Sequence, residues 1–152
     1  REKAEAFLRD CSSKLGNDHF AFLGCHWAGD EADFRNAIEL FWERMRHPYM
    51  KQVKTPGSRS VKAEVRAKLR QAEKVLLDAE ERRAYRAERV SVQERRMASE
   101  FFLRKGETAL VQGDDGEAKK CFRKVLELDP GDAGSAERLQ RASDALAAIK
   151  RS

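Results

Sequence analysis

The sequence predicts an all-α protein, and three observations support this prediction. Apolar residues recur at intervals of three and four, which is the spacing that places side chains on one face of a helix. The chain of 152 residues contains only 9 glycines and 3 prolines, so few residues interrupt helices. No segment combines an alternation of apolar and polar residues with β-branched residues, so we expect no strand.

Start and stop signals delimit three helices in the first third of the chain. An apolar stripe from Phe7 ends at Gly16, and Asp18 is expected to cap a very short helix that Gly24 closes. Asp30 begins a third helix, which must stop before Pro48. Its apolar stripe consists of Phe34, Ala37, Ile38, Phe41, Trp42 and Met45.

A loop and a long helix are predicted next. The segment from Tyr49 to Ser60 contains Pro56 and Gly57, lacks any period, and is expected to be an exposed loop. The long helix that follows buries one face, and Tyr85 to Val90 indicate one further helix. We expect the apolar side chains of the two long helices to form a core of Phe34, Ile38, Phe41, Val65, Leu69, Ala72 and Leu76.

The last third of the chain begins with a capping-box pattern, Ser91 followed by Glu94. Two helices are expected after it, one that ends at Gly113 and one that ends before Pro130, and a last helix runs from about Ser135. We therefore predict an N-terminal helix in residues 1–17, a helical domain in 18–90 and a second in 91–152.

Several classes of function are not expected for this sequence. It contains no glycine-rich phosphate loop, no Ser-His-Asp pattern and no metal-ligand cluster, so we expect no enzyme, no cofactor and no metal site. The cysteines Cys11, Cys25 and Cys121 are far apart and indicate no disulfide framework. No run approaches the roughly 18 apolar residues of a membrane-spanning helix. We expect a cytoplasmic protein without a membrane span.

Three segments between Asp18 and Arg89 carry a resemblance to a known family. They are Asp18-His19-Phe20-x-x-Leu23-Gly24, a helix that ends at His47-Pro48, and Ala72-x-x-x-Leu76-x-Asp78 followed by Arg82-Arg83-x-Tyr85. In this order they resemble the J domain of the DnaJ family. The resemblance implies a helical hairpin with flanking helices. It also implies a loop motif, His47, Pro48 and Tyr49, that engages a DnaK-type chaperone.

The loop motif departs from the family at its third residue, because Tyr49 stands where the family has Asp. A phenol is uncharged at neutral pH and cannot replace a carboxylate that meets basic groups on the chaperone. Glu39 and Glu43 also dilute a helix that is basic in the family. We therefore expect no stimulation of a DnaK-type ATPase, and a functional co-chaperone is the alternative. His47 and Pro48 are explained equally well as an ordinary helix end.

The segment around Gly106 resembles one tetratricopeptide repeat. The matching residues are Phe102-x-x-Lys105-Gly106-x-x-Ala109, Gly113-Asp114, Ala118-x-x-x-Phe122 and Pro130. Gly106 and Ala118 are small where the two helices would cross, Phe122 fills the gap, and the last helix caps the repeat. The resemblance implies a protein-binding groove lined by Glu100, Leu103, Glu107, Leu110 and Val111. A purely structural repeat is the alternative.

Positive charge is concentrated between Arg44 and Lys74, a stretch that contains ten lysines and arginines but only two glutamates. The expected partner surface consists of Arg44, Arg46, Lys51, Lys54, Lys62, Arg66 and Arg70. We favour an acidic protein partner over nucleic acid, because Tyr49 is the only aromatic residue of this stretch that could stack on a base. A solvated helix face is the third interpretation. The leading hypothesis is a non-enzymatic protein-interaction adaptor, and a nucleic-acid-binding module using residues 44–74 remains an alternative.

Overall fold

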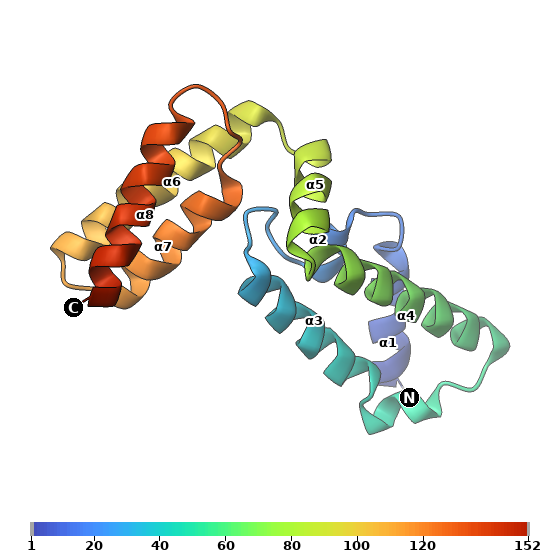
Figure 1. Ribbon diagram of the computed structural model, residues 1–152. Helices are drawn as coiled ribbons and strands as arrows, with labels where there is room; N and C mark the ends of the chain where they lie inside the picture. The colour runs from blue at the N-terminus through green and yellow to red at the C-terminus, as the bar shows by residue number, and fades with distance from the viewer. Residues whose placement is uncertain (1, 152) are drawn as a thin grey trace. The chain divides into compact units, whose positions relative to one another are not determined.

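The computed structural model describes residues 2–151, and over these residues it confirms the all-α fold class (Figure 1). The described chain contains eight α-helices, one 3-10 helix and no strand. It divides into two compact units, residues 1–82 and residues 83–152. The elements are α1 (Glu2–Ser13), α2 (His19–Leu23), α3 (Glu31–Met45), η1 (Pro48–Gln52), α4 (Pro56–Leu76), α5 (Ala79–Arg89), α6 (Val92–Val111), α7 (Asp115–Leu128) and α8 (Ser135–Arg151).

The caps predicted for α2 and for the start of α3 are confirmed, whereas α1 ends at Ser13, before the predicted stop at Gly16. The carboxylate of Asp18 accepts a hydrogen bond from the amide of Ala21 at 2.8 Å, and Gly24 ends α2 with a φ of 71°. This left-handed conformation favours glycine because it has no Cβ. Asp30 and Asp33 accept hydrogen bonds from each other's amides at 3.0 and 3.1 Å, which is a complete capping box at the start of α3.

The segment 49–60 is not a loop throughout, which corrects the sequence prediction. Pro48–Gln52 form η1, and α4 already begins at Pro56. Proline suits the first position of a helix because the N–H that it lacks has no partner there. The hydroxyl of Thr55 accepts a hydrogen bond from the amide of Ser58 at 3.2 Å. Met50, only 1% exposed, anchors η1 in the core.

The core of the first unit lies between α1, α3 and α4. The helices α3 and α4 run in opposite directions as a hairpin, α1 packs against α4 and η1, and α2 packs against α3 (Figure 1). Of the seven predicted core residues, Phe41 is half-buried and stacks on the ring of Phe22 at 5.0 Å between centroids. The six others are buried: Phe34, Ile38, Val65, Leu69, Ala72 and Leu76.

The N-terminal helix, predicted as a separate part over residues 1–17, belongs to the compact unit of residues 1–82. Four of its side chains lie in the same hydrophobic cluster as Ile38 and Leu69. They are Ala4, Phe7, Leu8 and Cys11. Burial of side chains as large as those of Phe7 and Leu8 stabilises a fold by about 1.5–3 kcal/mol each, so α1 is held mainly by its apolar stripe.

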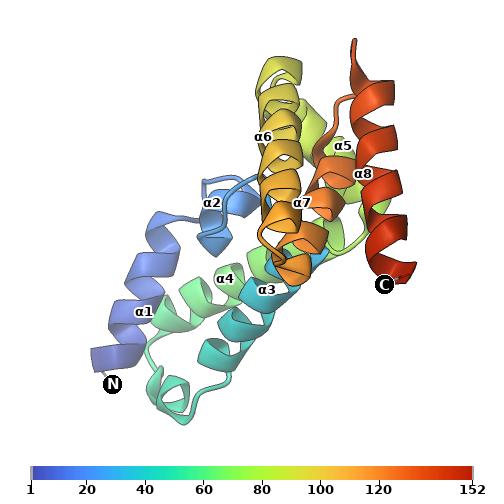
Figure 2. The ribbon, with the colours of Figure 1, turned by 90° about the vertical axis from the view of Figure 1, so that its left-hand side faces the viewer.

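The second unit is built on an antiparallel pair, α6 and α7, with α8 packed against both (Figure 2). At the crossing of the pair, a Cβ added to Gly106 would lie 2.8 Å from Cε1 of Phe122. The ring of Phe122 is fully buried and lies directly against the backbone of α6. Ala118 is also fully buried. Gly106 and Ala118, the two small residues expected at a close helix crossing, therefore both lie inside the second unit.

The division between the units falls inside α5, after Arg82, and therefore before the boundary predicted near Ser91. The physical reason is a pair of ionic contacts that join the second half of α5 to α7. Arg86 donates to Glu127 at 2.9 Å and Arg83 donates to it at 3.2 Å, and the side chains of Arg86 and Glu127 are almost completely buried. Ser91 nevertheless caps α6, since its hydroxyl accepts from the amide of residue 94 at 3.1 Å.

A buried carboxylate, Asp129, joins the three helices of the second unit at the end of α7. It accepts hydrogen bonds from the hydroxyl of Ser99 at 2.9 Å, from Nε of Arg138 at 2.7 Å, from the amide of Gly131 at 3.0 Å and from the hydroxyl of Ser135. The Asp129 side chain is 1% exposed. Burial raises its pKa, but the hydrogen bonds from Arg138, Ser135, Gly131 and Ser99 together outweigh burial and leave the pKa below its usual value.

Candidate functional site

The loop motif is held together by contacts among its own residues, His47, Pro48 and Tyr49. Nδ1 of His47 accepts a hydrogen bond from the amide of Tyr49 at 3.2 Å, so His47 acts as the N-cap of η1. Pro48 takes the first position of that helix. The rings of His47 and Tyr49 meet edge to face at 4.1 Å, and Tyr49 is half-buried against the core. The motif is therefore a compact turn between α3 and α4.

The seven basic residues expected to form one partner surface are only partly gathered. Arg44 lies over the ring of Phe7, with its guanidinium carbon 4.2 Å from the ring centroid. It lines a hollow whose other residues include Phe41. Lys51 lies in η1 and Lys54 follows it, both exposed. The remaining basic residues of the expected surface are Arg46, at the end of α3, and Lys62, Arg66 and Arg70 on α4.

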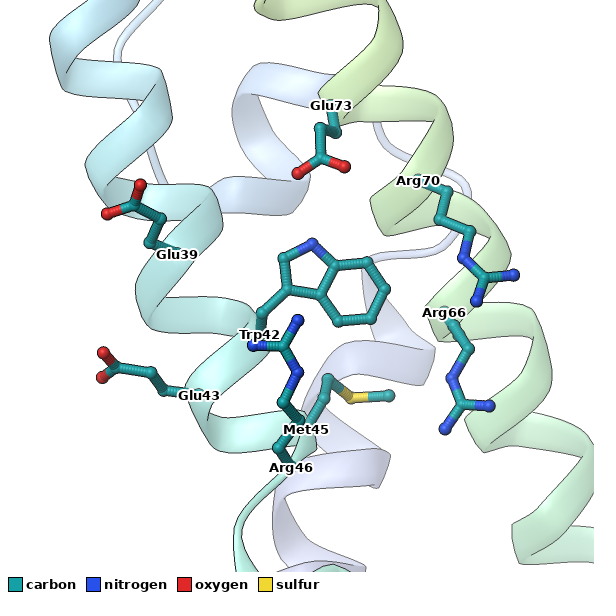
Figure 3. Close-up of a pocket in the computed structure, with 8 residues that line it drawn as sticks. All are labelled: Glu39, Trp42, Glu43, Met45, Arg46, Arg66, Arg70 and Glu73. Atoms are coloured by element: carbon teal, nitrogen blue, oxygen red, sulfur yellow. The ribbon is translucent and has the colours of Figure 1, made fainter.

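The structure brings Arg46, Arg66 and Arg70 to a cleft of about 650 Å³ between α3 and α4 (Figure 3). The indole of Trp42 extends from α3 into the space between the two helices. The residues that line the cleft are Glu39, Trp42, Glu43, Met45, Arg46, Arg66, Arg70 and Glu73. A volume of this size lies within the range of small-ligand binding sites.

The charges of the cleft are separated between its walls. Glu39 and Glu43 project from α3, one above the other, whereas Arg66 and Arg70 project one above the other from α4 (Figure 3). Arg46 lies over Trp42, with its guanidinium carbon 5.5 Å from the ring centroid. The α4 wall is thus mainly basic, and the α3 wall is acidic on its outer side.

Lys62, Arg66 and Arg70 form a row on α4, which we call the basic ridge. They are spaced by four residues, so their side chains are neighbours on one helix face. Among residues 2–151, none of the ion pairs includes a member of the ridge. Like charges at this spacing destabilise a helix by about 0.2–0.5 kcal/mol per pair. A negatively charged partner would remove this cost.

The groove predicted on α6 is not an open surface along the expected residues. Leu103 is 4% exposed and belongs to the core of the second unit. Both carboxylate oxygens of Glu107 accept from Arg141 of α8 at 2.6 Å, and Glu100 lies 3.7 Å from a guanidinium nitrogen of α8. Leu110 is half-buried on the same core, and only Val111, at 89% exposed, faces solvent fully. Packing of α8 against α6 covers this face.

Sequence reasoning missed the cleft, although it singled out several of its residues. In the sequence, Trp42 and Met45 belong to an apolar stripe, and Glu39 and Glu43 lower the positive charge of the helix. The spacing of four residues between Glu39 and Glu43 indicates an acidic row on one face of α3. Nothing in the sequence indicates that this face lies beside Arg66, because that contact depends on how the hairpin packs.

The part of the chain that the structure describes contains no group of three or more His, Cys, Asp or Glu residues placed to hold a metal ion. None of its helices is both long enough and apolar enough to cross a membrane. In comparisons with known proteins, no family model, no curated protein and no solved structure matches this chain.

Proposed function

We propose that this chain is a non-enzymatic adaptor, a J-like unit followed by a TPR-like unit, that binds an acidic protein surface through the basic ridge of α4. The observation that carries the proposal is the ridge itself. Three cations lie in one row on the helix, and the structure gives none of them an ion pair among residues 2–151. Such a row attracts negative charge over about 10 Å at ordinary ionic strength.

The arrangement of the helices supports the J-like and TPR-like parts of the proposal. A short α2 precedes the α3 and α4 hairpin, a His-Pro turn joins the hairpin, and α5 follows it, which is the order that the first resemblance implies. The contact of Gly106 with Phe122 is the close crossing that the second resemblance implies. Both resemblances are family likenesses in pattern, and protein binding is the function that they have in common.

Stimulation of a DnaK-type ATPase is not part of the proposal. Tyr49 offers no carboxylate, and its ring rests on the core instead of projecting from the turn. Glu39 and Glu43 place negative charge on α3, the helix that precedes the turn. A chaperone surface that recognises a basic helix followed by an aspartate would therefore meet negative charge on the helix and no charge at the third position of the turn.

The binding experiment measures fluorescence anisotropy of labelled poly-glutamate and of a labelled DNA oligonucleotide, each titrated with the chain at two salt concentrations. We expect binding of poly-glutamate that weakens with salt and falls about tenfold or more in the variant Lys62→Glu with Arg66→Glu. The control, Lys120→Glu with Arg123→Glu, makes the same charge change on exposed residues of α7 and should keep binding. Equal loss in both variants, or tighter binding of DNA than of poly-glutamate, would overturn the proposal.

The chaperone experiment measures ATP hydrolysis by a DnaK-type chaperone with and without the chain. We expect no stimulation, either by the chain as it is or by the variant His47→Gln. Stimulation that His47→Gln abolishes would make the chain a co-chaperone and refute this part of the proposal. The variant Tyr49→Asp restores the residue of the family, and it tests whether the missing carboxylate is sufficient to explain the lack of activity.

A further inference from the structure

We propose that the cleft between α3 and α4 binds a short peptide segment in which an apolar side chain lies next to a carboxylate. The apolar side chain would contact Trp42 and Met45, and the carboxylate would pair with Arg66 and Arg70. This inference rests on the proposed function, because it uses part of the basic ridge. It goes further by naming the class of peptide that the ridge selects.

The apolar part of the site is Trp42. Its indole is half-buried and extends into the cleft between the two helices, and the guanidinium of Arg46 lies over one face of the ring (Figure 3). Met45, which also lines the cleft, is buried and supports it from below. A tryptophan ring provides a large apolar contact area and loses little side-chain entropy, and for this reason tryptophan is frequent among residues that dominate binding energy.

The carboxylate part of the site is the pair Arg66 and Arg70. Two guanidinium groups one helical turn apart offer planar donors that match carboxylate oxygens. Arg46 adds a third positive charge beside the indole, at 5.5 Å from the ring centroid. The two guanidinium groups point away from the indole, and Glu73 extends toward it from the same helix (Figure 3). A carboxylate bound by Arg66 and Arg70 would therefore lie on the α4 side of the cleft, away from Glu73, while its neighbouring side chain reaches the ring.

The acidic wall of the cleft determines which polyanions are excluded. Glu39 and Glu43 line the cleft on the side of α3 that points away from α4 (Figure 3), so an anion long enough to cross α3 would meet repulsion there. Nucleic acid is such an anion. A peptide that is acidic on one side and apolar or basic on the other avoids the repulsion. Repulsive groups of this kind contribute to specificity as much as attractive ones do.

Intrinsic fluorescence tests occupancy of the cleft directly. The chain contains two tryptophans, and the variant Trp27→Phe leaves Trp42 as the only one. The probe is a short peptide with one leucine flanked by glutamates, and its control has alanine in place of leucine. We expect the leucine peptide to shift Trp42 emission to shorter wavelength and the alanine peptide to bind about tenfold more weakly, since burial of a leucine side chain is lost.

Two variants complete the experiment, both in the Trp27→Phe background. Arg66→Ala with Arg70→Ala should weaken the leucine peptide about tenfold, whereas Lys120→Ala with Arg123→Ala should leave it unchanged. Glu39→Gln with Glu43→Gln should keep peptide binding and increase binding of a DNA oligonucleotide. Circular dichroism checks that each variant is folded.

The outcomes separate this inference from the proposed function. If the peptide binds through Lys62 and Arg66 but Trp42 emission does not shift, binding by the basic ridge is supported. The cleft is then refuted as the binding site of the peptide. If leucine and alanine peptides bind equally, the apolar contact is refuted. If neither the peptide nor poly-glutamate binds, both proposals fail.

Discussion

Replacement of Gly106 by alanine should destabilise the second unit even though alanine is the better helix former. The gain in helix propensity is about 1 kcal/mol. Against it, the new Cβ would lie 2.8 Å from Cε1 of Phe122, which is shorter than real Cβ contacts, and 3.0 Å from two further atoms of the ring. The ring is fully buried and cannot turn away without moving its neighbours. Overpacking of this kind costs about 1–3 kcal/mol, so we expect a net loss of about 1 kcal/mol.

The assay is urea unfolding followed by two signals. Circular dichroism reports all helices, whereas tryptophan fluorescence reports residues 1–82, because both tryptophans, Trp27 and Trp42, lie there. A matched control is Gly116→Ala, whose Cβ would have no neighbour closer than 3.8 Å and which should stabilise by a few tenths of a kcal/mol. If Gly106→Ala proves as stable as the unchanged chain, the close crossing does not constrain this position.

Two further predictions concern buried groups. Asp129→Asn should lower the free energy of unfolding by about 3 kcal/mol at about pH 7, because it breaks a buried pair with Arg138. Since the folded-state pKa of Asp129 is lowered, its contribution is complete above about pH 4 and is lost as the pH falls toward the folded pKa, so urea unfolding at about pH 3 should show a smaller difference. Burial raises the pKa of Cys11 to about 11, so alkylation at about pH 8, mapped by mass spectrometry, should label Cys11 more slowly than the half-buried Cys25 until urea is added. Equal labelling rates in the folded protein would contradict this reasoning.

Helix starts could be predicted where the signal is local. Asp18, Asp30 and Ser91 each accept a hydrogen bond from an amide three residues ahead, and this contact needs nothing beyond the segment itself. The start of α4 is harder to predict, because proline is as common in loops as in the first position of a helix, and Pro56 occupies the latter. Burial of Met50, which holds η1, depends on α1 and α4 and has no local signature.

The site was less predictable than the fold because its residues meet only through packing. The charge count located the basic stretch, but it could not separate Arg44, which stacks on a ring from α1, from Arg66, which lines the cleft. The pattern of α6 suggested a groove, yet Leu103 is in the core because α8 packs there. Amphipathic spacing indicates that a face is covered. It does not identify the element that covers it.

The carboxylate at the end of α7 has a consequence for how α6 and α8 align. Apolar side chains in a helix interface can interchange neighbours if one helix slides by a turn, and much of the contact area survives. Asp129 opposes such a slip, because displacement of Ser99 or Arg138 would leave its buried carboxylate without one of its hydrogen-bond donors and so destabilise the slipped arrangement. The surrounding aliphatic residues could therefore be exchanged for others of similar volume while the alignment of the three helices is preserved.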